Sequence, residues 1–124
     1  FFYAQNPVAS EIDSINNIPF NKKIENLLES EKIYKRNLAD SKTINYDYGI
    51  AESYENLALV YYYQGEYEQS HKYNVLAIKS FQTQNKLNKV AKIYGDLKAF
   101  LMPRECLPKN LNLQEMQQIN LNNP

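Results

Sequence analysis

The sequence predicts an all-α fold in which antiparallel helical hairpins stack as a short solenoid. Three observations support this prediction. Long segments rich in Leu, Ile, Lys, Glu and Gln are separated by few turn residues, and the 124 residues include only three glycines. Apolar residues recur at helical spacing. The chain also matches itself when shifted by forty positions, which pairs Ala51 with Ala91, Tyr54 with Tyr94 and Leu57 with Leu97.

The first part of the pattern lies before the best-defined unit. Apolar positions between Ile24 and Leu38 predict a helix that ends near residues 46–49, where Gly49 lies. Pro19 falls where the preceding helix of the same unit would run. Because proline interrupts a helix interior, we expect this first unit to be incomplete.

The best-defined unit is a helical hairpin. Its first helix carries one apolar face from Ala51 to Tyr61, and Gly65 follows, where glycine adopts the left-handed conformation at low cost. A second amphipathic run, from Tyr67 to Phe81, begins directly. So short a turn makes the two helices antiparallel. After a break at 85–88, a third run covers 90–101 and stops at Pro103.

Residues 51–70, AESYENLALVYYYQGEYEQS, closely resemble a tetratricopeptide repeat (TPR). The resemblance covers about residues 22–102, and the forty-residue period is similar to the longer variety found in many bacterial signalling proteins. It departs from the family pattern at Asn74, where an aromatic residue is common. The resemblance implies that the residues packing the helices together are Tyr54, Leu57, Ala58, Tyr61, Gly65, Tyr67, Ser70 and Ala77.

We divide the chain into three parts. Residues 1–5 are predicted to be a signal-peptide remnant, because an apolar run closes on a small residue, Ala4, before a polar segment. Residues 6–102 form the TPR-like helical domain, with one full repeat at 51–84 flanked by partial repeats. Residues 103–124 form a C-terminal cap or linker. A signal peptide places the protein outside the cytoplasm, in the periplasm or secreted; without one, the protein is cytoplasmic.

In proteins that the sequence resembles, one stripe of the first helix of each hairpin lines a concave groove that binds peptides. Here the stripe is acidic at one end, where we expect the carboxylates to meet a basic partner, and aromatic at the other. Alternatively, Tyr62 and Tyr63 pack on neighbouring helices. The predicted ligand-groove residues are Glu52, Glu55, Asn56, Leu59, Tyr62, Lys92, Asp96 and Ala99.

Charge and residue chemistry argue against several other functions. Fourteen basic and fourteen acidic residues are interspersed, which argues against nucleic-acid binding. The single histidine, His71, is expected to be a solvated surface residue, and with the single Cys106 it falls short of a zinc site or a nucleophile pair. The sequence therefore predicts a protein that is not an enzyme, uses no metal or cofactor, and makes no direct membrane contact in this segment.

The leading hypothesis is a protein- or peptide-binding scaffold, an extracytoplasmic TPR module of a bacterial signalling or adaptor protein. Two alternatives stay open. The incomplete repeats leave apolar surface at the hairpin ends, which favours a self-association module that forms a homodimer. If the first residues are not a signal remnant, the chain is instead part of a cytoplasmic, peptide-responsive TPR regulator.

Overall fold

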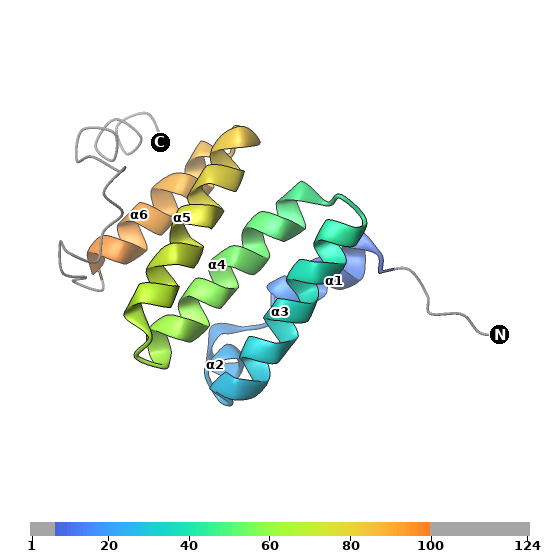
Figure 1. Ribbon diagram of the computed structural model, residues 1–124. Helices are drawn as coiled ribbons and strands as arrows, with labels where there is room; N and C mark the ends of the chain where they lie inside the picture. Colours follow the sequence, from blue (N-terminus) through green and yellow to red (C-terminus); the bar gives the residue numbers. More distant parts are fainter. Residues whose placement is uncertain (1–6, 100–124) are drawn as a thin grey trace.

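The computed structural model describes residues 7–99, and over this range it contains six helices and no strand (Figure 1). The all-α prediction is therefore confirmed. The long helices lie side by side in chain order, each packed against the next. The signal remnant, the 103–124 cap and Cys106 lie outside the described residues. The helices are α1 (Ala9–Asn16), α2 (Phe20–Lys23), α3 (Leu27–Thr43), α4 (Asp47–Tyr63), α5 (Tyr67–Thr83) and α6 (Leu87–Ala99).

The last four helices begin at intervals of twenty residues, at Leu27, Asp47, Tyr67 and Leu87. The three turns between them share one geometry. Each contains a residue with positive φ, which is 54° at Asn45, 80° at Gly65 and 58° at Asn85. The next N–H always donates to the carbonyl five residues back, at 2.9 Å for Tyr46, Glu66 and Lys86 alike. This is the Schellman ending of a helix, and asparagine follows glycine in tolerating its left-handed position.

One helix boundary differs from the prediction because of these turns. Helix α3 ends at Thr43, and the left-handed residue is Asn45 rather than Gly49. Gly49 lies in the first turn of α4 and is buried. A Cβ there would lie 2.6 Å from Tyr46 and 2.9 Å from Ile12. The glycine therefore serves the close approach of α1 to α4, and not the turn.

The leading helix of the first unit, which we expected to be incomplete, is present in two pieces. Helix α1 ends at Asn16, and α2 begins at Phe20 with Pro19 as its N-cap. Proline has no N–H to donate, so it is tolerated at a helix start but not inside a helix. Helix α1 packs against both α3 and α4, as the leading helix of a hairpin would.

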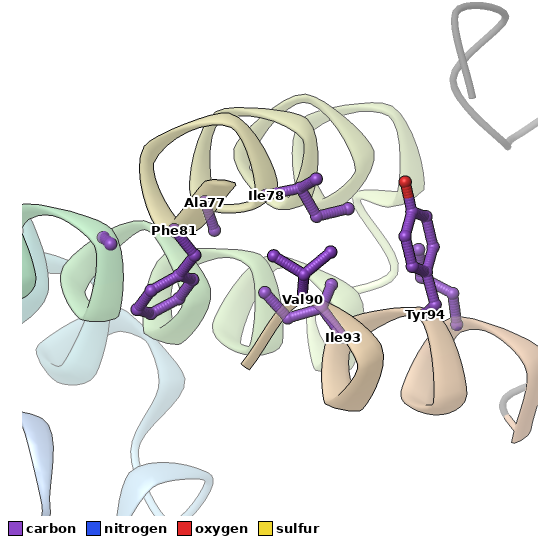
Figure 2. Close-up of a cluster of buried hydrophobic side chains, with 8 residues drawn as sticks. Ala77, Ile78, Phe81, Val90, Ile93 and Tyr94 are labelled. Atoms are coloured by element: carbon purple, nitrogen blue, oxygen red, sulfur yellow. The ribbon is translucent and has the colours of Figure 1, made fainter. Parts of the chain in front are cut away.

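Between α5 and α6 the interior is apolar. Figure 2 shows Ile78 and Phe81 of α5 facing Val90 and Ile93 of α6. Tyr48 and Tyr54 of α4 pack against the edge of this cluster. A second cluster joins α3 to α4 through Tyr34, Leu57, Val60 and Tyr61. We call the first set the apolar core; it consists of Ala51, Ala77, Ile78, Phe81, Val90, Ile93, Tyr94 and Leu97.

Between α1, α3 and α4 the interior also contains buried polar side chains, beside Ile12 and the second cluster. Asn37 Nδ2 donates to the Ile12 carbonyl at 3.2 Å and to Ser53 Oγ at 3.4 Å. Asn56 Nδ2 donates to the carbonyl and to the side-chain oxygen of Asn16, at 3.2 and 3.0 Å. These bonds satisfy most of the buried polar groups, and Asn37 Oδ1 is the one atom of the four side chains that has no hydrogen-bond partner among the described residues. We call them the polar network; its side chains are Asn16, Asn37, Ser53 and Asn56.

The structure places the eight predicted packing residues in four environments. Five are buried, Tyr54 packs partly buried against the apolar core, and Gly65 occupies the left-handed turn. Tyr67 is 49% exposed, and its part in packing the helices together stays a prediction. As the first residue of α5, it lies at the hairpin end beyond the core, where its ring contacts Tyr62. The five buried residues are Leu57, Ala58, Tyr61, Ser70 and Ala77.

Candidate functional site: a charged cleft

A cleft of about 400 Å³ lies along α4. The end of α1 and helix α2 form one wall, and α6 forms the other. Helix α4 lies between the walls, because its side chains bond to Lys23 of α2 on one side and to Lys89 of α6 on the other. The cleft is lined by Asn16, Asn17, Phe20, Lys23, Glu52, Glu55, Asn56, Leu59, Lys89, Lys92 and Asp96.

The structure brings most of the predicted groove residues together. Tyr62 lines a smaller adjoining pocket of about 40 Å³, and its ring lies 5.2 Å from that of Tyr63. Ala99 ends α6, and its side chain lies outside the described residues. That these residues bind a ligand stays a prediction. Those lining the cleft itself are Glu52, Glu55, Asn56, Leu59, Lys92 and Asp96.

Ion pairs join α4 to α6 across the cleft. Lys89 Nζ lies 3.3 Å from Glu52 Oε2 and 3.5 Å from Glu55 Oε1. Lys92 Nζ lies 3.1 Å from Glu55 Oε2 and 3.3 Å from Asp96 Oδ2. Burial alone would lower the pKa of both lysines, but the carboxylates, Glu55 first, outweigh it and raise the pKa of each.

These pairs correct the expectation of an acidic groove end that is open to a basic partner. Both glutamates already have lysine partners, because Lys89 and Lys92 lie one turn apart on the helix that faces them. Glu52 is also largely buried. An incoming cation would therefore have to displace a lysine. The pairs brace one wall of the cleft against α4.

Lys23 differs from the other two lysines of the cleft. Its Nζ donates to Asn56 Oδ1 at 2.7 Å, and within residues 7–99 no carboxylate oxygen forms an ion pair with it. Burial lowers the pKa of Lys23, and the nearby charge of Glu55 opposes this only in part. An ammonium group can donate three hydrogen bonds. Only one of them is used within the part of the chain that the structure describes.

Sequence reasoning missed one wall of the cleft. Asn16, Asn56 and Asp96 lie forty residues apart and all line the cleft, so shifting Asn56 by the repeat length would have found Asn16. Lys89 precedes the predicted Lys92 by one helical turn. Phe20 and Lys23 had no such signal, because the four residues of α2 are too few to show a periodic pattern.

The expectation for His71 is wrong. The side chain is half-buried, and neither ring nitrogen has a hydrogen-bond partner among the described residues. Burial lowers the pKa of the imidazole, which favours the neutral form. His71 does not line the cleft.

Comparison of the chain with protein-family models, with curated proteins and with solved structures gave no match. The assignment to the TPR type therefore stays a prediction that rests on the residues quoted above. Within residues 7–99, no helix combines the length and the apolar composition needed to cross a membrane.

Proposed function

We propose that the chain is a non-catalytic module of the tetratricopeptide type that binds a protein or peptide segment in the cleft. The supporting observation is the cleft itself, with its side chains held by ion pairs on α6 and by hydrogen bonds on α2. Its volume of about 400 Å³ lies within the range of ligand-sized sites. Side chains held in place before binding reduce the entropy lost on binding.

The resemblance to bacterial signalling proteins also suggests where the module is located and which kind of protein contains it. We place it outside the cytoplasm, as part of a signalling or adaptor protein. A cytoplasmic regulator is the alternative. The support comes from the first residues of the chain, which lie outside the described range, and from the resemblance.

A peptide selection tests the proposed function. A random octapeptide phage library is selected on the immobilised chain, and enriched peptides are synthesised and titrated in solution. The decisive variant is Leu59→Arg, which places a long side chain in the cleft from α4. The matched control is Leu28→Arg on α3, where the leucine is 71% exposed and outside the cleft.

We expect the selected peptides to bind the wild type and Leu28→Arg equally and to lose at least tenfold in affinity for Leu59→Arg. Equal binding to all three proteins would place the site elsewhere and contradict the proposal. A library from which no peptide is enriched would contradict it as well. Circular dichroism of each variant shows that the fold is kept.

A second candidate function is self-association. Exposed apolar side chains gather at one end of the molecule, where α2, the start of α3 and the α4–α5 turn meet. Light scattering across a concentration series tests this alternative. A mass of two chains that falls to one in Tyr67→Glu supports it, and a mass of one chain throughout contradicts it. The side chains concerned are Phe20, Leu28, Tyr63 and Tyr67.

A further inference from the structure

The charges in the cleft are unevenly divided between its walls. On the side of α4 and α6, two lysines lie among the three carboxylates Glu52, Glu55 and Asp96, so the formal charge there is 2 − 3 = −1. On the side of α1 and α2, Lys23 is the one charged residue among residues 7–99 that lines the cleft, so the formal charge there is +1. The α2 wall is therefore the wall that offers a cation.

Lys23 is also held in place by the polar network. Its acceptor, the side-chain amide of Asn56, is itself fixed, because Nδ2 donates to both oxygens of Asn16. The amide oxygen is thereby turned toward Lys23. A half-buried cation without a counter-ion carries a desolvation cost, and a carboxylate that arrives with hydrogen bonds offsets it. The site therefore needs little rearrangement to accept a carboxylate.

An apolar surface lies beside this cation. Phe20 lines the cleft three residues before Lys23 on α2, and residues at that spacing lie on the same side of a helix, about 5–6 Å apart at Cβ. Its ring packs edge-on against Tyr63 at 5.5 Å, yet half of the side chain is exposed. In an extended peptide, side chains two residues apart share a face at about 7 Å. The two spacings differ by only about 1–2 Å, which the long side chain of Lys23 can span.

We propose that the segment bound in the cleft carries an aspartate or glutamate that pairs with Lys23, and a large apolar residue two positions away that packs on Phe20. This inference rests on the proposed function and names the chemistry of its ligand. A single ammonium beside neutral amides suits a singly charged carboxylate. A phosphate group, with nearly twice the charge, is better matched by arginine or by two cations.

Three octapeptide mixtures test the inference by fluorescence anisotropy. All have phenylalanine at position six and randomised flanks, and they carry Glu, Gln or Lys at position four. We expect the Glu mixture to bind the wild type roughly tenfold more tightly than the Gln mixture, as is typical of a hydrogen bond between charged groups. In Lys23→Met this preference should fall below twofold, and in Lys23→Arg it should persist.

Lys23→Arg keeps the positive charge, so it should keep the preference for Glu if that charge is what the peptide recognises. A folding defect in either variant would instead lower the binding of all three mixtures alike. A preference for Glu that survives Lys23→Met would overturn the inference, as would tightest binding of the Lys mixture. If the mixtures bind equally but lose affinity in Leu59→Arg, this inference fails and the proposed function stands. If no mixture binds the wild type although the random library yields peptides that do, the inference fails and the proposed function stands. If the library also yields none, both fail.

Discussion

The two walls of the cleft are attached to the protein by different interactions. Helix α6 is held by the apolar core, in which Val90, Ile93 and Tyr94 are almost fully buried. The opposite wall, formed by α1 and α2, combines the buried Ile12 with hydrogen bonds of Asn16, Asn56 and Lys23. Apolar packing is strong and non-directional, whereas hydrogen bonds fix orientation but contribute less each. We infer that the α1–α2 wall is precisely oriented and the less strongly held.

The largest expected effect lies on the apolar wall. Replacing Phe81 with alanine removes a fully buried ring from the apolar core and leaves a cavity between α5 and α6 (Figure 2). We expect the free energy of unfolding to fall by about 3–5 kcal/mol. Urea denaturation followed by circular dichroism measures it. A loss below about 1 kcal/mol would mean that α6 is not held by this core.

An intermediate effect is expected where α1 approaches α4. Gly49→Ala adds a Cβ that would lie 2.6 Å from Tyr46 Cδ2, 2.8 Å from Ser41 Oγ and 2.9 Å from Ile12 Cγ2. Since several neighbours would have to move, we expect a loss of about 1–3 kcal/mol in the free energy of unfolding. Hydrogen exchange should show faster opening of α1 than of α6.

Gly95→Ala is the matched control for this substitution. It lies within α6, where a Cβ would meet no described atom within 4 Å apart from its own helix backbone and chain neighbours. Here only helix propensity acts, and a gain of up to about 1 kcal/mol is expected. If both substitutions stabilise the protein, the close approach of α1 is not a constraint.

The smallest effect at neutral pH concerns Tyr34. Its hydroxyl donates to the carbonyl of Ile15 at 3.0 Å and so ties α1 to α3. Burial raises the pKa of Tyr34 from 10.0 to about 12. Because the folded state holds this proton more tightly than the unfolded state, the stabilisation is complete below pH 10 and is lost as the pH rises toward about 12.

The absorbance of tyrosinate at 295 nm, followed during alkaline titration, should show one group fewer titrating near pH 12 in Tyr34→Phe than in the wild type, in which Tyr46 also has a pKa of about 12. The substitution itself should cost about 1 kcal/mol at pH 7, the typical value of one hydrogen bond. An unchanged titration curve in Tyr34→Phe would show that the hydroxyl is not held against Ile15.

The same contrast explains what the sequence could predict. Apolar periodicity identified α4, α5 and α6 because these helices pack through apolar side chains. Tyr54 and Leu57, three residues apart on α4, are examples of such side chains. It could not identify the polar network, since Asn16, Asn37 and Ser53 are of residue types that usually lie at the surface, although here they are buried. The pairing of Lys92 with Glu55 joins residues 37 apart, and no local pattern encodes it.

The equal turns at Asn45, Gly65 and Asn85 impose a counting rule on how such a chain can change in length. Each step of helix and turn takes twenty residues and reverses the direction of the chain. An insertion of twenty residues would therefore reverse every later helix, so that helices lining the cleft and helices outside it would exchange places. Tandem duplication of forty residues keeps every later helix on its own side and adds another position in the register of Asn16, Asn56 and Asp96. Evolution can therefore lengthen the cleft only by pairs of helices.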